Sequence, residues 1–261
     1  MKDCVLNIHQ IIREEKVTTM YQPIVSLSNG EIIGYEALSR GPVNTDMYSP
    51  LSLIAAAEKE ELTWELEMLF RRKAIETAES LPKDKRLFVN VDPKIFSSGN
   101  YQKGFTKKYL SKYNINIKNI VFEITERTSI DDYNVFKKIT QHYRNQGYTL
   151  AIDDVGSGYS GLKSISELKP NYIKIDMDII RNIDTDNVKQ AIIGALVMIS
   201  RDINTNIIAE GIETYEELQT LIRLGVQNGQ GYLLCKPIKK IIDKLPEISS
   251  TIRLLNKNSS N

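Results

Sequence analysis

The chain has 261 residues, of which 41% are hydrophobic, and this suits one large α/β domain or two small ones with a sizeable core. Its 34 basic and 33 acidic residues give a net charge of +1, so no long-range field favours polymeric nucleic acid or an anionic membrane. With only Cys4 and Cys235, no signal-peptide pattern at the start and no apolar run longer than 191–199, we expect a reduced, cytoplasmic chain without a transmembrane segment.

Short runs rich in β-branched and aromatic residues recur along the chain and predict eight strands. These runs are 22–27, 31–38, 86–91, 119–124, 148–152, 172–175, 205–209 and 231–234. Most of the gaps between them carry amphipathic patterns that predict helices, at 51–79 in two pieces, 131–144, 187–201 and 215–224. Strands that alternate with helices in this way indicate a parallel sheet.

The first two predicted strands differ from the others, because only Ser28, Asn29 and Gly30 separate them. So short a connection suits a tight hairpin and an antiparallel start. The whole pattern favours an α/β fold, a TIM-like (β/α)8 barrel with an antiparallel first strand, over an open doubly wound sheet. No linker divides the chain, so we expect a single domain over 1–261. Its core would span about 17–245, with the first dozen residues and the polar tail 256–261 outside the core pattern.

One predicted strand ends in two adjacent carboxylates, Asp153 and Asp154, and continues into a glycine-rich turn. Neighbouring aspartates repel each other, so a bound cation is one explanation of the pair and a solvated turn is the other. Gly156, Gly158 and Gly161 also match the G-x-G-x-x-G of dinucleotide-binding folds. Two aspartates directly before that turn would repel a pyrophosphate, which argues against a nicotinamide cofactor.

Polar residues interrupt or follow the predicted strands about once per barrel unit. They are Glu36, Asn90, Glu123, Asp153, Lys174, Glu210 and Gln230. In a barrel such groups converge at the carboxyl-terminal mouth, where they indicate catalysis. Each has a structural alternative when taken alone: Asn90 can cap a turn, Lys174 can extend to solvent, and Glu36 can pair with Arg40 on the surface. Together, so many carboxylates at the strand ends would repel one another without cations.

The predicted donors are all oxygen atoms, whereas His9 and His142 are isolated and no Cys–His spacing occurs. Oxygen donors favour Mg²⁺ or Mn²⁺ over zinc. One carboxylate that bridges two such ions suits in-line displacement at phosphorus, and Asp153 is the candidate bridge. No paired nucleophile stands out, so the predicted attacking group is a metal-activated water.

A series of motifs between residues 17 and 240 carries a family resemblance. They are Gln22, Glu36-Ala37-Leu38-Ser39-Arg40, Phe88-Val89-Asn90, Glu123-Ile124-Thr125-Glu126, Asp153-Asp154 with its glycine loop, Ile173-Lys174-Ile175-Asp176, Glu210-Gly211-Ile212-Glu213 and Gln230-Gly231-Tyr232. With these motifs the chain resembles the EAL-domain family of cyclic di-GMP phosphodiesterases. It departs from the family at Val155, where Phe is usual, and at Gln227, where an acidic residue is common.

The resemblance implies that two Mg²⁺ or Mn²⁺ ions hydrolyse one phosphodiester of cyclic di-GMP to linear pGpG. One ion would be held by Glu36, Asn90, Glu123 and Asp153, and the other by Asp153, Asp154 and Glu210. Lys174 would hydrogen-bond the attacking water, Glu210 would help to deprotonate it, and Gln230 would assist. The substrate would be contacted by Gln22, Leu38, Arg40, Asp176, Glu213 and Gln230, with Arg40 on a phosphate.

The resemblance also implies that Glu126, Gly156 and Gly158 support a loop that links the site to a homodimer interface on nearby helices. Val155 bears on the packing of that loop, although it supplies no ligand. The apolar helical stretch at 191–199 suits complete burial or a second subunit on one side. A binding module that senses cyclic di-GMP without cutting it is the alternative function, and an unidentified regulatory partner is compatible with either.

Overall fold

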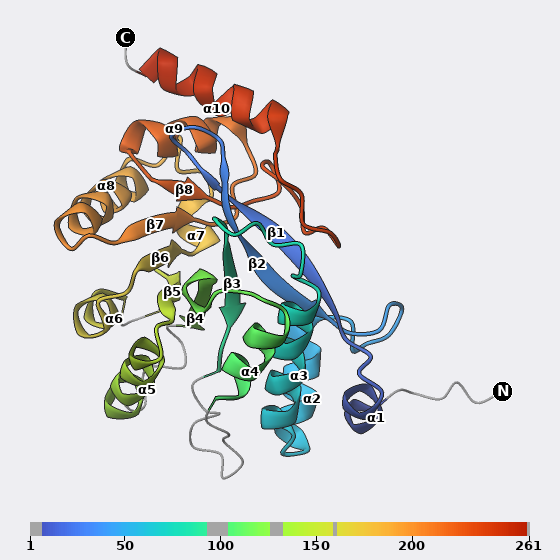
Figure 1. The fold of residues 1–261 in the computed structure, drawn as a ribbon. Coiled ribbons are helices and arrows are strands. Elements are labelled where there is room, and N and C mark those ends of the chain that lie inside the picture. The colour runs from blue at the N-terminus through green and yellow to red at the C-terminus, as the bar shows by residue number, and fades with distance from the viewer. Residues whose placement is uncertain (1–6, 93–103, 126–132, 159–160, 260–261) are drawn as a thin grey trace.

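The computed structural model describes residues 7–92, 104–125, 133–158 and 161–259 (Figure 1). Its centre is a closed barrel in which the strands follow one another in chain order. They are β1 (Thr18–Ser26), β2 (Ile32–Arg40), β3 (Arg86–Asn90), β4 (Ile120–Thr125), β5 (Thr149–Val155), β6 (Tyr172–Ile175), β7 (Asn206–Ala209) and β8 (Asn228–Gly229). The expected TIM-like barrel is therefore confirmed.

Strand β1 runs against both of its neighbours, β2 and β8, whereas every other adjacent pair is parallel. The reversal follows from the short connection at Ser28, Asn29 and Gly30. Gly30 adopts a φ of +76° and its N–H donates to Ser26 O at 2.9 Å, which closes the hairpin. The predicted antiparallel first strand is confirmed.

Helices surround the barrel (Figure 1). They are α1 (Ile8–Arg13), α2 (Pro50–Lys59), α3 (Thr63–Glu76), α4 (Phe105–Lys112), α5 (Tyr133–Asn145), α6 (Gly161–Leu168), α7 (Met177–Ile180), α8 (Asn187–Asp202), α9 (Tyr215–Leu224) and α10 (Pro246–Ser259). Local signals set their ends: Pro50 follows the N-cap Ser49 of α2, and Thr214 with Glu217 forms a capping box on α9. The outward strand residues and these helices form the main core.

The eighth strand was predicted at the wrong place, because residues 231–234 form a turn and β8 is Asn228–Gly229. The backbone of Gly231 approaches Ile212 so closely that a Cβ would lie 2.1 Å from Ile212 O. Leu233 N–H donates to Ile212 O at 3.1 Å, so this apolar run is bonded to the loop after β7. The turn places Gln230 at the mouth of the barrel.

Both ends of the described chain pack against other elements more than their sequence patterns indicate. Ile8 and Ile11 of α1 are buried beside Leu53 of α2 and Leu66 of α3 in a second cluster. Asn256, in the expected tail, lies in α10 and donates to Leu27 O at 2.9 Å. The predicted helix at 131–144 corresponds to α5, and its first two residues lie outside the described chain.

Helix α8 buries Ile193 and Val197 and exposes Ile192 and Met198, so one face packs on the barrel and the other stays open in the single chain. Within the described ranges every helix is too short or too polar to span a lipid bilayer.

Candidate active site

The site residues stand one layer above an apolar plug inside the barrel. Ile24, Phe88, Val121, Ala151 and Ile208 fill the interior. Because side chains alternate along a strand, the residue two positions further toward the mouth also points inward. These residues are Gln22, Asn90, Glu123, Asp153 and Glu210, with Gln22 lying before Ile24 because β1 is reversed. The strand period therefore stacks a polar layer directly on the plug.

Lys174, which is almost completely buried on β6, lies at the centre of this polar layer. Its Nζ is 2.8 Å from Glu123 Oε1, 2.8 Å from Glu210 Oε1 and 3.0 Å from Asp153 Oδ1. The fourth carboxylate oxygen near Nζ is Glu36 Oε2, at 3.5 Å. The alternatives of a solvent-reaching Lys174 and a surface pair between Glu36 and Arg40 are both wrong.

Burial raises the pKa of Glu123 well above its usual range, against the lowering effect of Lys174, and the charges of Glu36 and Asp153 add to the rise. Burial likewise raises the pKa of Glu210 well above its usual range. Burial alone would lower the pKa of Lys174, but the surrounding carboxylates prevail and raise it. The ammonium group is held charged, and the carboxylates gain from further positive charge.

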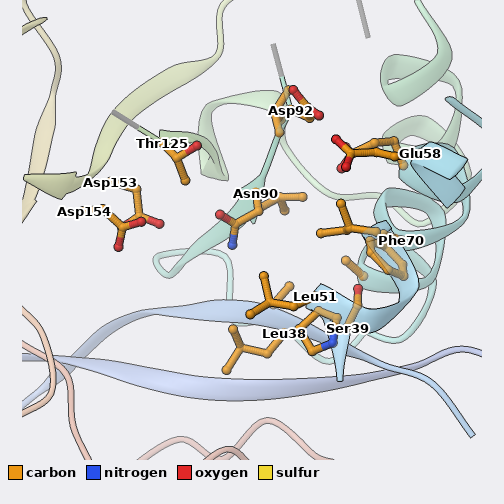
Figure 2. Close-up of a pocket in the computed structure, with 17 residues that line it drawn as sticks. Leu38, Ser39, Leu51, Glu58, Phe70, Asn90, Asp92, Thr125, Asp153 and Asp154 are labelled. Carbon is orange, nitrogen blue, oxygen red and sulfur yellow. The ribbon is translucent and has the colours of Figure 1, made fainter. Parts of the chain in front are cut away.

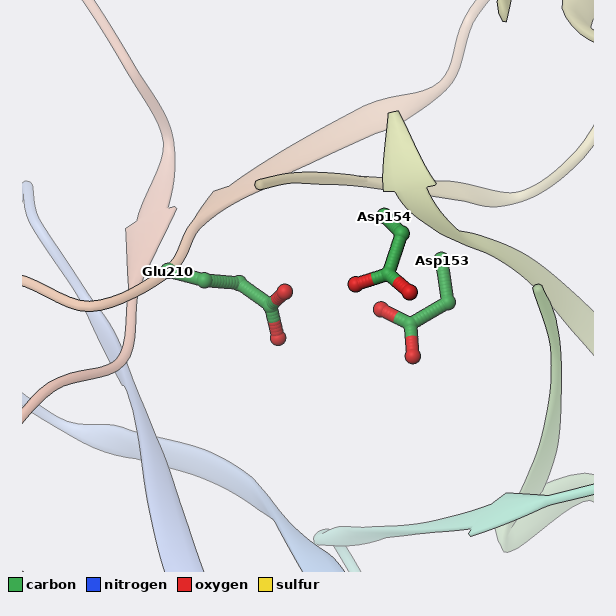
Figure 3. Close-up of side chains that lie close together, drawn as sticks. All are labelled: Asp153, Asp154 and Glu210. Atoms are coloured by element: carbon green, nitrogen blue, oxygen red, sulfur yellow. The ribbon is translucent and has the colours of Figure 1, made fainter. Parts of the chain in front are cut away.

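Asp153, Asp154 and Glu210 each offer an oxygen, and these oxygens all lie within 4.8 Å of one another. Figure 3 shows Glu210, which directly follows β7, directed at the two aspartates of β5. Neighbours in a regular strand point to opposite faces, but the register of β5 shifts between Ile152 and Val155. Asp154 takes a φ of +57°, and this local irregularity directs both aspartates into the mouth.

The donor set fits divalent cations. Four carboxylates, those of Glu36, Glu123, Asp153 and Glu210, surround the ammonium group of Lys174, and Asp154 offers a fifth beside Asp153 and Glu210. When all five carboxylates are ionised, their charge exceeds that of Lys174 by four, which is the charge that two divalent cations carry. Within the described residues, Glu123 Oε2 is buried and accepts no hydrogen bond. Carboxylate and amide oxygens of this kind suit Mg²⁺ or Mn²⁺.

A chain of amides holds Glu36. Gln230 Nε2 donates to Glu36 Oε2 at 2.7 Å and to Gln22 Oε1 at 3.0 Å. Gln22 Nε2 donates to Cys235 O, and Asn90 Nδ2 donates to Glu36 Oε1 at 3.2 Å. Asn90 thus donates to Glu36, another predicted metal ligand, rather than capping a turn. The network keeps the Glu36 carboxylate facing Lys174.

Two cavities flank the acidic centre. One, of about 460 Å³, extends from Asp153 and Asp154 past Asn90 toward α2 and α3, where Glu58 and Phe70 line it (Figure 2). Leu38 and Ser39 also line this cavity. The other, of about 360 Å³, is lined by side chains from the opposite half of the mouth. They include Gln22, Asp154, Asp176, Met177, Glu210, Glu213, Gln230 and Tyr232. The centre therefore lies between two hollows.

Some predicted residues stand apart from the centre. Arg40 ends β2 next to the cavity-lining Ser39 and donates to Ser39 O at 2.8 Å. Asp176 caps α7 by accepting from Asp178 N–H at 2.7 Å. Gly156 has a φ of +105°, and Gly158 follows it, while Glu126 lies outside the described residues. Val155 is buried in the main core at the end of β5.

The sequence pattern missed an ionic network behind Glu213. Arg181 lies 3.0 Å from Glu213 Oε1 and 3.2 Å from Glu217 Oε1. The Thr214-x-x-Glu217 capping pattern could have drawn attention to Glu217. Arg181 has no comparable signal, since it follows the short helix α7 and meets its partners only through the fold.

The fold and the site together define a TIM-like barrel with an acidic candidate metal centre at its strand ends. The EAL domain family model matches residues 6–237, and the chain belongs to this family. The probable cyclic di-GMP phosphodiesterase PdeB of Escherichia coli is 30% identical over 237 residues, covering 89% of this chain and 45% of PdeB. The chain spans about half the length or less of the curated relatives that it matches.

Solved structures agree with this assignment. A standalone EAL protein from Vibrio cholerae O395 in its c-di-GMP-bound form is 35% identical, with a TM-score of 0.79, covering 89% of this chain and 97% of that one. Klebsiella pneumoniae BlrP1, in a calcium and cyclic di-GMP complex, is 28% identical with a TM-score of 0.79, covering 94% of this chain and 60% of that one. The closed barrel excludes the open dinucleotide-binding sheet considered for the glycine turn.

Proposed function

We propose that this chain is a metal-dependent phosphodiesterase that hydrolyses one phosphodiester bond of cyclic di-GMP to linear pGpG. The observation that carries the proposal is the excess of carboxylates around Lys174 and at Asp153, Asp154 and Glu210. A set of oxygen donors with so little positive charge among them suits two divalent ions. The family and the cyclic di-GMP bound in the similar structures support the choice of substrate.

In the proposed reaction a water adds to phosphorus and the ribose O3′ leaves, which yields a 5′-phosphate. Two Mg²⁺ or Mn²⁺ ions, when bound, would polarise the phosphodiester and ease deprotonation of the water. Glu36, Asn90, Glu123 and Asp153 would hold one ion, and Asp153, Asp154 and Glu210 the other.

The protein groups at the centre would orient the water and take up its proton. Lys174 Nζ donates hydrogen bonds and would orient the attacking water. Glu210, whose pKa burial raises, would accept the proton of that water. Gln230 keeps Glu36 in place through its 2.7 Å hydrogen bond.

The shape of the mouth supports a two-armed substrate. Cyclic di-GMP carries its phosphates in a ring with one guanine on each side, and the acidic centre likewise lies between cavities of about 460 and 360 Å³. Phe70 and Leu51 line the first cavity, and Tyr232 lines the second, so each offers an apolar or aromatic surface to a base. Arg40, Leu38, Asp176 and Glu213 would contact the substrate around this centre.

The open face of α8 supports the further proposal of a homodimer. Val188, Ile192 and Met198 share this face and are exposed in the single chain. Exposed apolar side chains at helical spacing suit a protein interface. Sedimentation of Met198→Glu against the wild-type protein tests it, and a wild type that remains monomeric at high concentration contradicts it.

Incubation with cyclic di-GMP and Mn²⁺, followed by chromatography, tests the main proposal. The wild-type protein should produce pGpG, and a chelator should stop the reaction. Asp153→Asn should lower turnover at least about a thousandfold, because it removes the charge of the one carboxylate proposed for both ligand sets. The matched control is Asp178→Asn, on a carboxylate outside the described cavities, which should retain activity.

Undiminished turnover of Asp153→Asn would contradict the assignment of the centre. If the wild-type protein binds cyclic di-GMP and yields no product with any divalent metal, the sensor function takes the place of the enzyme.

A further inference from the structure

We propose that Arg181 is a positioning residue that fixes the Glu213 carboxylate for hydrogen bonds to the nucleoside groups of the substrate. The inference rests on the proposed function, because it assigns Glu213 to the binding of cyclic di-GMP. Arg181 does not line either cavity beside the acidic centre, and it would act entirely through Glu213.

Arg181 joins two glutamates of very different exposure. Its Nη2 lies 3.0 Å from Glu213 Oε1, and the Glu213 side chain is 45% exposed at the edge of the 360 Å³ cavity. Its Nη1 donates to Glu217 Oε1 at 3.2 Å, and the Glu217 side chain is 1% exposed. One arm of the guanidinium group is thus anchored in the protein, and the other holds a side chain of the binding cavity.

The anchor at Glu217 is rigid because both of its oxygens accept several hydrogen bonds. Oε1 also accepts from Asn182 N–H at 3.1 Å. Oε2 accepts from the backbone N–H groups of Glu213 at 2.9 Å and Thr214 at 3.2 Å. Glu217 therefore fixes the backbone of Glu213, and Arg181 fixes its side chain.

The same network joins the two segments that form this side of the cavity. Glu210 N–H donates to Ile175 O at 3.1 Å. Gly211 packs so closely on Met177 that a Cβ would lie 2.4 Å from Met177 Cβ. The segment that leads into Arg181 and the segment that leads from β7 to Glu213 are thus packed together along this side of the cavity.

The charge of the cavity gives Arg181 a second effect. Asp154, Asp176 and Glu210 already line this cavity, and the proposed substrate carries phosphates. An unpaired Glu213 would add to the repulsion of those phosphates. Paired with Arg181, it remains a directed acceptor for a ribose hydroxyl or a guanine N–H group, with its charge offset.

Binding of cyclic di-GMP is measured by calorimetry in Ca²⁺, the ion in the BlrP1 complex, and turnover in Mn²⁺. Arg181→Gln should raise Kd and KM about fivefold, the range of a partly exposed ion pair, and change kcat less than twofold. Arg181→Lys should recover part of the loss, since one ammonium group cannot serve both carboxylates equally. Hydrolysis of bis(p-nitrophenyl) phosphate should not change, because this diester lacks the donors that Glu213 would contact.

A double-mutant cycle identifies the route of the effect. In a Glu213→Gln background, Arg181→Gln should change Kd less than twofold, because its partner is already neutral. Arg223→Gln is the matched control, since Arg223 bonds to Gln190 between α8 and α9 away from the cavities, and it should leave Kd unchanged.

Additive effects in the cycle, or an equal loss of activity on the small diester, would overturn the inference. Binding of cyclic di-GMP by the wild-type protein without cleavage would reject the proposed enzyme and still leave the Kd cycle as the test of Arg181. No binding by the wild-type protein would overturn both. If Arg181→Gln does not fold, the cycle of Arg181→Lys with Glu213→Gln decides.

Discussion

Two buried glutamates in this barrel have opposite surroundings. Glu217, behind the cavity, is 1% exposed and accepts hydrogen bonds from Arg181 and from three backbone N–H groups. Glu123, at the centre of the mouth, is fully buried, and its pKa is raised by burial and by neighbouring carboxylates. Within the described residues, its Oε2 accepts no hydrogen bond.

The difference separates a structural carboxylate from one that is arranged for a ligand. Burying a carboxylate costs free energy unless donors or cations surround it. The fold supplies those donors to Glu217, so the group stabilises a loop. It supplies Glu123 with one shared lysine and several like charges, so the centre gains free energy when cations bind.

Of the substitutions that test the contrast between Glu123 and Glu217, Lys174→Met should have the largest effect on stability. Without the ammonium group the metal-free protein would hold its buried carboxylates with no cation, which should cost about 3–5 kcal/mol of unfolding free energy. Mn²⁺ should restore much of that stability, while turnover stays at least about a hundredfold below wild type, because the water loses its donor. Urea unfolding with chelator or Mn²⁺ measures the first effect, and the pGpG assay measures the second.

Lys137→Met is the control for this experiment, since Lys137 makes an exposed pair with Glu167 at 3.2 Å. It should change stability by no more than about 0.5 kcal/mol. A metal-free Lys174→Met protein as stable as wild type would contradict the charge imbalance.

Glu67 tests the same contrast where no metal is proposed. Burial raises its pKa from 4.5 to about 7 against the lowering effects of Arg71, 4.0 Å away, and of a backbone hydrogen bond at Asp92, while the charge of Asp92 adds to the rise. The folded protein then binds a proton more tightly than the unfolded chain, so stability falls as the pH rises between these values. Between pH 5 and 8 the wild-type protein should lose about 2–3 kcal/mol more than Glu67→Gln. Parallel pH profiles of urea unfolding for the two proteins would contradict the raised pKa of Glu67.

Glu123→Gln and Glu217→Gln compare the two glutamates directly and should give the smallest changes in stability. In chelator, Glu217→Gln should lose about 1–2 kcal/mol, because an amide NH₂ would face N–H donors. Glu123→Gln should be as stable as wild type or more so, because it removes one of the excess charges. Chemical unfolding of the two variants side by side measures this. Equal losses of unfolding free energy in the two variants would contradict the distinction between a structural carboxylate at Glu217 and a ligand-binding one at Glu123.

Several elements could be read from local patterns. Helix α9 was predicted at its observed limits, because Thr214 and Glu217 form a capping box and Gly225 ends the helix with a φ of +81°. The polar layer was also predictable, since each strand carries its polar residue two positions beyond an inward apolar one. Phe88 with Asn90 and Val121 with Glu123 show the period directly.

The misplaced eighth strand shows the limit of local patterns. The residues 231–234 have the composition of a strand, yet Asn228 and Gly229 pair with β1 and β7. Only two residues are needed to close the barrel, because the neighbouring edges are already set by β1 and β7. The apolar run that follows is free to bond with the loop at Ile212.

The sequence by itself determined the barrel, its reversed first strand and the identity of the oxygen donors, because strand period, turn length and side-chain chemistry are local properties. Only the tertiary structure decided how the charges are distributed. The irregularity at Asp154 directs two adjacent aspartates to one side, and closure of the barrel surrounds Lys174 with carboxylates from four other strand ends. The pairing of Arg181 with Glu213 was also decided there, because contacts between distant segments depend on where the chain brings them together.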